Sequence, residues 1–404
     1  MSAEVHNAVD RLLLEQGEYS PLEYLLSEGR LLYSDYERWR GGELGYLDEA
    51  LFGDPLQALR CLRQAGAYLQ RLGWQVEAVS YTPWHGEPSP ARPGVLRFSA
   101  DSALHRLFHQ CYHKPQDRPQ LDLFTDNPAT SLANGVIQSL ADRDAGGARR
   151  QLDQLGDIAP DYPRLGELER LTEAMEALKA PVDDPGAELR YLQETLMPLA
   201  DTLLGNASNA LLIPLWRRLS GALVGQAYCP AAPQRHLSYT AMQALDWAVV
   251  RESVEKEPGW RDHPVLLQRH ARTCELQGER CVALQSWFCL CWKFPDSAAA
   301  LRSSGDAELR WQWWAFEELD AELPTPDFPA WLLLRLPGLT RLMPDPDNQV
   351  AADTAIIPDS YRTLYCLCRS RTPADPVSAR DDIALRARLR SENPLLLQCF
   401  LETR

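Results

Sequence analysis

Apolar residues recur every three or four positions along most of this 404-residue chain, and this spacing constrains the fold more than any other feature. The clearest run follows Asp54 and Pro55, an N-cap residue and a proline at the first helical position. Gly73 ends the run, whose apolar positions are Leu56, Leu59, Leu62, Ala65, Leu69 and Leu72. Similar spacing predicts helices at 9–14, 21–26, 35–39, 102–113, 383–389 and 394–401, and a helical pattern that continues after Pro295 through Phe316. The fold class is therefore predicted to be mainly α.

Two short stretches break the helical pattern in the N-terminal part of the chain. Residues 75–81 and 95–98 alternate apolar and polar side chains as strands do. Prolines between them exclude regular structure in the intervening segment. We therefore expect a small two-stranded β element within the N-terminal helices.

Two later stretches share one spacing. Ala148, Leu152 and Pro160 stand four and eight residues apart, and Ala283, Trp287 and Pro295 repeat these intervals. In the second stretch Gly278 precedes the alanine by five residues, and Ala271 lies seven residues before the glycine.

This pattern resembles the second helix of a tetratricopeptide unit, in which a small residue lets two helices approach closely and proline ends the pair. The first stretch departs from the pattern, since Arg143 stands at the glycine position and Val136 at a small-residue position. Residues 186–257 have no clear third copy. The resemblance implies an irregular tetratricopeptide-like array of helix pairs, and an unrelated α-bundle is the alternative.

The chain length predicts two or three domains, and proline-rich segments suggest where they begin and end. We expect the following parts: an N-terminal, mostly helical domain (1–114), a connector (115–128), a helical-repeat domain (129–300) and a proline-rich helical segment packed on the repeats (301–404). Pro198 and Pro214 are expected to kink or break helices of the repeat domain.

Composition excludes several classes of protein. The net charge of −15 argues against direct, strong binding to the phosphate backbone of nucleic acid. No apolar run approaches the roughly 18 residues of a membrane-spanning helix, and the first residues do not resemble a signal peptide. The ten cysteines are expected to be reduced and mostly buried. We therefore expect a cytoplasmic, bacterial-type protein that does not enter a membrane.

One pentapeptide in the connector points to a partner. Its residues are Gln120, Leu121, Asp122, Leu123 and Phe124. They match the motif Gln-Leu-(Ser or Asp)-Leu-Phe, by which bacterial replication and repair proteins bind the β sliding clamp. Such a pattern should occur by chance in about one chain in a thousand of this length. An extended peptide of this kind binds by placing apolar anchors in a preformed groove.

The resemblance implies a role for each motif residue. Leu123 and Phe124 would fill the hydrophobic pocket of the clamp, and Leu121 would occupy a shallower subsite. Gln120 would form a hydrogen bond at the edge of the groove, and Asp122 would stay near solvent. The alternative is that Leu121, Leu123 and Phe124 belong to the core of this protein, with Phe124 packed on the next helix.

Three histidines form the second candidate site. On a helix, His105, His109 and His113 would lie four residues apart in a stripe that could hold a transition metal. Leu104 and Phe108 lie on the apolar face of the same predicted helix, so the histidines are expected on its solvated face. We therefore predict no metal site.

The paired cysteines are expected to pack in the core, and His263 and His270 are expected to be packing or surface residues. Cys289 and Cys291, like Cys366 and Cys368, are separated by a single residue, whereas zinc sites prefer two. His270 stands four residues before Cys274, and we expect packing rather than a base–nucleophile pair.

Together these features predict a non-enzymatic accessory protein of bacterial DNA replication or repair, without a cofactor. It would bind the β sliding clamp through the pentapeptide and a second protein through its helical repeats. The alternatives are a helical-repeat scaffold unrelated to DNA, with the pentapeptide buried, and an enzyme that uses the histidine stripe.

Overall fold

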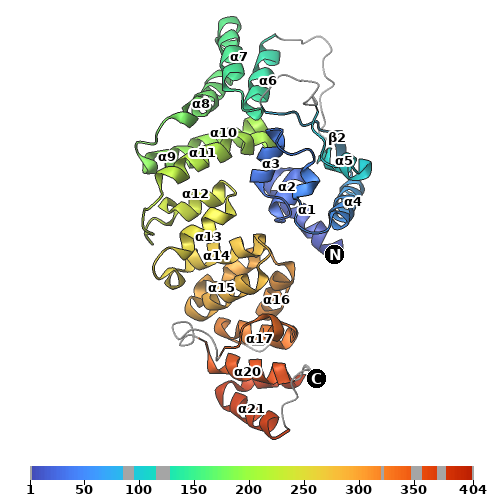
Figure 1. The fold of residues 1–404 in the computed structure, drawn as a ribbon, viewed down its shortest axis with the longest axis vertical. Coiled ribbons are helices and arrows are strands. Elements are labelled where there is room, and N and C mark those ends of the chain that lie inside the picture. Colours follow the sequence, from blue (N-terminus) through green and yellow to red (C-terminus); the bar gives the residue numbers. More distant parts are fainter. Residues whose placement is uncertain are drawn as a thin grey trace. The chain divides into compact units, whose positions relative to one another are not determined.

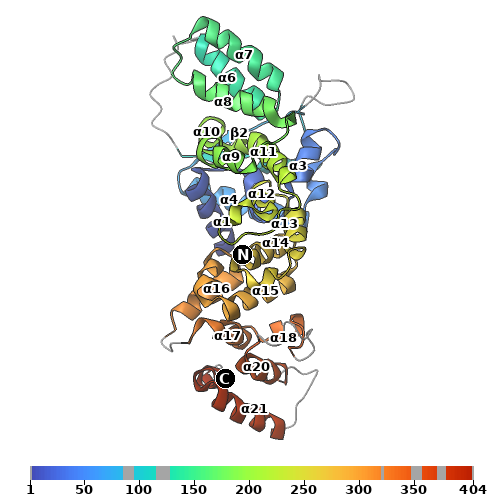
Figure 2. The same cartoon turned by 90° about the vertical axis from the view of Figure 1, so that its left-hand side faces the viewer.

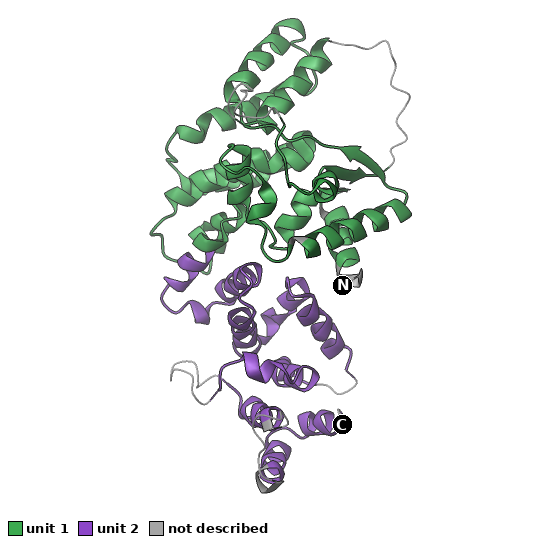
Figure 3. Ribbon diagram, turned by 45° about the vertical axis from the view of Figure 1, so that its right-hand side comes forward, with its two compact units in different colours: residues 1–249 green, residues 250–404 purple. Residues whose placement is uncertain are grey.

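The computed structural model describes residues 2–84, 95–114, 128–319, 323–346, 357–370 and 379–402. It is mainly helical with one small antiparallel sheet, which confirms the predicted fold class (Figure 1). The chain forms two compact units, residues 1–249 and 250–404 (Figure 3). The four-part organisation expected from the sequence stays a prediction.

The first unit begins with helices that enclose one apolar core. These are α1 (Ser2–Gln16), α2 (Pro21–Ser27), α3 (Tyr33–Arg40), α4 (Pro55–Arg71) and α5 (Ser102–Phe108). Helix α4 begins as predicted, because the side chain of Asp54 accepts a hydrogen bond from the backbone nitrogen of Leu56 at 2.9 Å. Its interior apolar positions are buried, whereas Leu56 and Leu72 at its two ends are exposed.

The small sheet differs from the prediction. Strand β2 (Gln75–Ala78) lies where a strand was expected, but residues 95–98 contribute only an isolated bridge from Arg97 to Tyr46. The central strand is β3 (Gln110–His113), which pairs antiparallel with both β2 and β1 (Glu18–Tyr19). Residues 110–113 were expected to be helical. Their pairing with two segments that are distant in sequence explains the difference, since a local pattern cannot reveal it.

The rest of the first unit is an array of helices. It contains α6 (Pro128–Ala141), α7 (Ala145–Ile158), α8 (Leu165–Glu176), α9 (Pro185–Tyr191), α10 (Met197–Leu204), α11 (Ser208–Ala222) and α12 (Leu237–Gln243). Helices α6, α7 and α8 pack on one another (Figure 2). Helix α13 (Trp247–Glu255) then leads into the second unit.

The two stretches with tetratricopeptide-like spacing are helix pairs. The first is α6–α7, and the second is α14 (Pro264–Leu276) with α15 (Arg280–Lys293). In the second pair Ala271 and Ala283 are fully buried where the two helices pack. Gly278, between the helices, has a left-handed φ of +76°, and Arg143 at the matching position of the first pair has a φ of +58°. The turn therefore keeps its conformation although the glycine is missing.

Polar contacts join the N-terminal helices of the first unit to its array. We call this set the junction, and it comprises the pairs Glu23–Asn209, Glu37–Arg143, Glu37–Arg217 and Arg40–Asp142. Arg143 makes several contacts around this junction. Its Nη1 lies 2.8 Å from Glu37, its Nε donates to the carbonyl oxygen of Ala210 at 2.7 Å, and its guanidinium carbon lies 3.9 Å from the ring centroid of Trp84.

The two prolines expected to interrupt helices have different effects. Pro198 follows a π-helical turn, Leu192–Leu196, and sits in the first turn of α10. Pro214 lies inside α11, which continues from Ser208 to Ala222. The expected interruption is therefore a local π turn before Pro198, and at Pro214 the helix is not broken.

Besides the α14–α15 pair, the second unit contains further helices. These are η6 (Trp260–Asp262), η7 (Pro295–Ser303), α16 (Ala307–Glu317), α17 (Phe328–Arg335), α18 (Leu339–Leu342), α20 (Asp359–Ser370), α21 (Ala379–Glu392) and α22 (Pro394–Glu402). Aromatic rings of α16 and α17 form part of the core, with Trp313 and Phe328 at 4.9 Å between centroids. In the described part of the chain, no helix is both long enough and apolar enough to cross a membrane.

Candidate functional site

The predicted clamp-binding pentapeptide lies outside the described residues. Gln120, Leu121, Asp122, Leu123 and Phe124 all fall in the segment 115–127. The structure does describe the elements at either end of that segment, where β3 ends at His113 and α6 begins at Pro128. Both elements belong to the first unit.

The predicted histidine stripe does not form. Helix α5 ends at Phe108, so His109 is its C-cap residue and His113 lies on β3. The three histidines therefore do not share one helix face, and each is half-buried rather than on a solvated face. Among the described residues, no group of three or more histidines, cysteines and carboxylates is placed to hold a metal ion.

Two of these histidines instead bind the backbone around them. The Nδ1 atom of His105 accepts a hydrogen bond from the backbone nitrogen of Phe98 at 3.2 Å. The Nδ1 atom of His109 donates to the carbonyl oxygen of Val79 at 2.6 Å. Burial lowers the pKa of both imidazoles. His105 and His109 therefore hold together three segments of the N-terminal helical part.

The paired cysteines pack as expected. Cys289 and Cys291 lie on α15, and Cys366 and Cys368 lie on α20. Cys291 and Cys368 are buried, and burial raises the pKa of Cys291 well above its usual range. A thiol with a raised pKa stays protonated and is a poor nucleophile and metal ligand.

His270 belongs to a hydrogen-bonded chain that the sequence did not reveal. Its Nε2 donates to the carboxylate of Glu255 at 3.1 Å, and its Nδ1 lies 2.8 Å from the hydroxyl oxygen of Ser286. Burial is the main cause of its lowered pKa, so the ring is neutral at neutral pH. With Nε2 carrying the proton, Nδ1 is the acceptor of the ring, and the Ser286 hydroxyl can donate its one proton either to this atom or to the carbonyl oxygen of Val282 at 3.4 Å. Cys274 lies 3.8 Å from the ring, and burial raises its thiol pKa to about 12.

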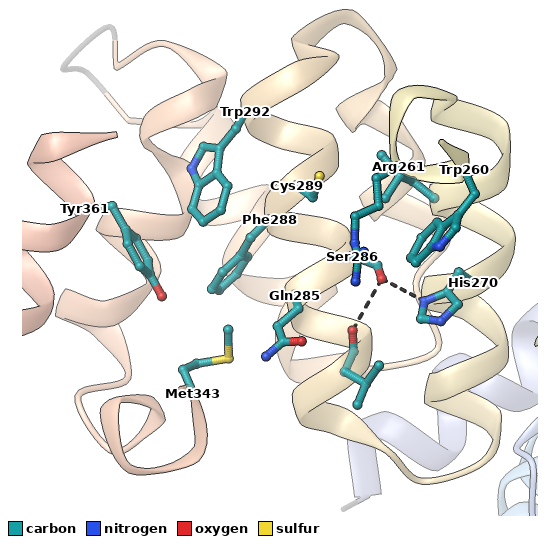
Figure 4. Close-up of a pocket in the computed structure, with 12 residues that line it drawn as sticks. Trp260, Arg261, His270, Gln285, Ser286, Phe288, Cys289, Trp292, Met343 and Tyr361 are labelled. Carbon is teal, nitrogen blue, oxygen red and sulfur yellow. Dashed lines mark hydrogen bonds between the residues drawn. The ribbon is translucent and has the colours of Figure 1, made fainter. Parts of the chain in front are cut away.

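His270 and Ser286 of this hydrogen-bonded set line one wall of a pocket in the second unit (Figure 4). The pocket lies over one face of α15 and is bordered by residues of η6, α14 and α20 and by Met343, next to α18. It is lined by Trp260, Arg261, Leu267, His270, Val282, Gln285, Ser286, Phe288, Cys289, Trp292, Met343 and Tyr361. Aromatic side chains and a few polar groups in one concavity are typical of a small-molecule site.

The sequence of α15 explains why a pocket forms there. Apolar residues occupy every face of this helix, so one face packs on α14 while another remains for later elements. Phe288 and Trp292 on that second face contact Tyr361, with ring centroids 5.9 and 5.2 Å away. The pocket lies beside these contacts, where the packing leaves space.

The serine–histidine–carboxylate chain positions groups but does not resemble a hydrolytic site. Ser286 is only 4% exposed and lies in the middle of α15, where helical hydrogen bonds occupy the backbone N–H groups. Glu255 is paired with Arg251 as well as with His270. The chain therefore fixes the orientation of His270, whose ring packs against Trp260 at 4.4 Å between centroids.

Sequence reasoning missed this pocket because its residues span about a quarter of the chain, from Trp260 to Tyr361. The one local signal was the all-round apolar character of residues 280–293, which indicates a helix packed on more than one side. Comparison of the chain with family models, with curated proteins and with solved structures found no match. Function must therefore be inferred from the residues of this chain.

Proposed function

We propose that this protein is a non-catalytic adaptor of bacterial DNA replication or repair that binds the β sliding clamp through residues 120–124. The pentapeptide itself carries the proposal, because it matches the clamp-binding motif at all five positions. Isolated motifs of this kind bind with about micromolar affinity, equivalent to about −8 kcal/mol.

The position of the motif in the chain supports this proposal. Residues 114–127 join β3 of the N-terminal helical part to α6, the first helix of the array. A partner bound there would be tethered next to both parts of the first unit. The net charge of −15 disfavours direct binding to the DNA backbone, so a clamp would supply the link to DNA.

The helix pairs support a second binding partner. Arrays of packed helix pairs present extended surfaces, and proteins built from them typically bind other proteins. In our proposal the α6–α7 pair of the first unit and the α14–α15 pair of the second unit each present a surface of this kind, and the clamp motif brings the bound partner to the replication machinery. Such an adaptor would act in the cytoplasm without a cofactor.

Surface plasmon resonance of the full chain against immobilised β clamp from the same species tests the proposal. The double variant Leu123→Ala/Phe124→Ala removes both apolar anchors and should abolish binding. Asp122→Ser is the matched control, because the motif accepts serine or aspartate at this position, and its affinity should stay within about twofold of the parent.

The same variants distinguish the alternative function. Saturable binding that only the double variant loses supports the adaptor. If the parent protein does not bind the clamp, the replication role is refuted. A double variant whose melting temperature also falls by several degrees would assign Leu123 and Phe124 to the core, as expected for a helical-repeat scaffold unrelated to DNA.

A further inference from the structure

Helix α16 exposes two tryptophans on one face. Of the twelve tryptophans of the chain, all of which lie in the described ranges, Trp311 and Trp314 are the exposed ones, at 66% and 57%. They stand three residues apart and are therefore neighbours on the helix surface. The opposite face of α16 is buried and packs on α17 through Trp313 and Phe316. The two exposed rings are thus not part of that packing.

These two rings form a sizeable apolar patch. A whole tryptophan side chain offers about 250 Å², so the exposed fractions of Trp311 and Trp314 amount to about 300 Å². Among the described residues, neither ring contacts another aromatic ring or a cation. Exposed apolar patches of this size are often functional, and tryptophan is strongly enriched at the energetic centres of protein interfaces. The patch is therefore a candidate docking surface.

One carboxylate lies on the same face. Glu318, the C-cap residue of α16, stands four residues after Trp314 and seven after Trp311, so it continues the same stripe. Its side chain is exposed and forms no ion pair with any described residue, whereas Glu308 and Glu317 of α16 each bind an arginine. Because Glu318 also lies at the negative end of the helix dipole, it favours a cation. We call Trp311, Trp314 and Glu318 the α16 face.

The chemistry of the α16 face selects a guanidinium group. The face of an indole ring attracts cations, and a planar guanidinium stacks on it while its N–H groups still reach a carboxylate. An ammonium group is more strongly hydrated and cannot stack in this way. Nucleobases also stack on tryptophan, but the carboxylate would repel the phosphates that accompany them. An arginine of a partner protein therefore fits this face best.

The chain contains the same arrangement elsewhere. In the first unit the guanidinium carbon of Arg143 lies 3.9 Å from the ring centroid of Trp84, and its Nη1 lies 2.8 Å from Glu37. In the second unit the guanidinium carbon of Arg335 lies 5.7 Å from the ring centroid of Trp331. The α16 face supplies two rings and a carboxylate, so one arginine from a partner would complete the same set of contacts.

We infer that the α16 face binds an arginine-bearing segment of a partner protein, whose guanidinium stacks on Trp311 or Trp314 and pairs with Glu318. The arginine within α16, Arg310, donates instead to the carbonyl oxygen of Ser304, before the start of the helix. The inference does not rest on clamp binding, because the α16 face lies in the second unit and residues 120–124 fall in the range of the first.

Fluorine NMR of the full chain, with every tryptophan replaced by 5-fluorotryptophan during expression, tests the inference. Trp311→Phe and Trp314→Phe each remove one resonance and so assign the two signals of the α16 face. The probe is the peptide acetyl-Gly-Arg-Gly-Arg-Gly-amide, and its matched control carries citrulline, which has the shape of arginine without the charge. The arginine peptide should shift both resonances saturably with a Kd on the order of 1–10 mM, because one cation–π contact and one exposed ion pair are weak. The citrulline peptide should bind at least about fivefold more weakly.

Two variants locate the binding. Trp311→Ala leaves the Trp314 signal as the readout and should weaken binding about threefold, because one of the two rings is lost. Glu318→Gln should also weaken binding about threefold, as expected for the loss of an exposed ion pair. Glu252→Gln is the matched control, since it removes the same charge from another exposed glutamate of this unit and should have no effect. All three changes are at exposed positions, so melting temperatures should stay within about 2 °C of the parent.

Several results would overturn the inference. These are the absence of a saturable shift of either tryptophan signal with the arginine peptide, equal binding of the citrulline peptide, and equal weakening by Glu252→Gln and Glu318→Gln. A further one is a dimer of this chain, seen by analytical ultracentrifugation, that Trp311→Ala/Trp314→Ala abolishes. That result would assign the α16 face to a second copy of the chain instead of a partner protein.

Discussion

Replacing Arg143 by alanine and by glycine separates two contributions to the stability of the first unit. Arg143 adopts a left-handed backbone conformation, φ +58°, that glycine adopts at the matching position of the second helix pair. This conformation costs a non-glycine residue about 1 kcal/mol of conformational free energy. The side chain offsets that cost through the junction, where it contacts Glu37, Ala210 and Trp84.

The magnitudes follow from these contacts. Hydrogen bonds to a charged group contribute about 1.5–3 kcal/mol, and a desolvated cation–π contact about 0.5–2 kcal/mol. Glu37 keeps Arg217 as a partner when Arg143 is removed, so it is not left unpaired. We therefore expect Arg143→Ala to lower the free energy of unfolding by about 2–4 kcal/mol. Arg143→Gly should cost about 1 kcal/mol less, because the glycine relieves the backbone.

Urea unfolding followed by circular dichroism measures both variants, with the free-energy change taken from the midpoint shift. Gly278→Ala is the backbone control. An added Cβ there meets no atom within 4 Å, so its expected cost of about 1 kcal/mol is conformational alone. Equal midpoints for Arg143→Ala and Arg143→Gly would refute the backbone argument. A loss below about 0.5 kcal/mol for Arg143→Ala would refute the junction argument.

Further predictions concern other buried groups. Burial raises the pKa of Glu23 from 4.5 to about 7, and Asn209 lies beside it. The contribution of Glu23 to stability is therefore full below about pH 4.5 and is lost as the pH rises through about 7. Glu23→Gln should accordingly stabilise the protein by up to about 3 kcal/mol in urea unfolding at pH 8, and by little at pH 4.5. Ala283→Leu should lower stability by about 1–3 kcal/mol and reduce the melting temperature, because Ala283 and Ala271 are buried where α14 and α15 pack. With Ellman's reagent, Cys229 should react first, since it is the one exposed cysteine among the residues that the structure describes, and Cys229→Ser should remove that fast phase.

The helices were predictable because their signals are local. The N-cap Asp54, the stop at Gly73 and the tetratricopeptide-like spacing around Ala283 each act within a few residues, and the helices that these signals predict are present in the structure. Strand β3 was not predictable in this way. Tyr112 and its neighbours pair with strands near residues 19 and 76, and nothing within residues 102–113 records those partners. The histidine stripe was wrong for the same reason, because it assumed that the helix continued past Phe108.

The pocket shows a second limit of sequence reasoning. Trp260, Gln285 and Tyr361 are unremarkable where they stand in the sequence, and only the packing of η6 and α20 beside α15 brings them together. The pocket therefore depends on tertiary packing, which no local sequence pattern records. A spacing rule can reveal a site whose residues all lie in one short segment, and it misses a site assembled from four elements.

Departures from a repeat pattern were as informative as matches. Arg143 replaces the glycine expected between α6 and α7, and by local rules this substitution weakens the resemblance. In the structure the same residue keeps the turn conformation of glycine and contacts Glu37 on α3, outside the helix pair. At this turn the strained residue therefore makes a contact beyond its own helix pair. The matching turn at Gly278 keeps the unstrained residue, and an added side-chain carbon there would contact nothing.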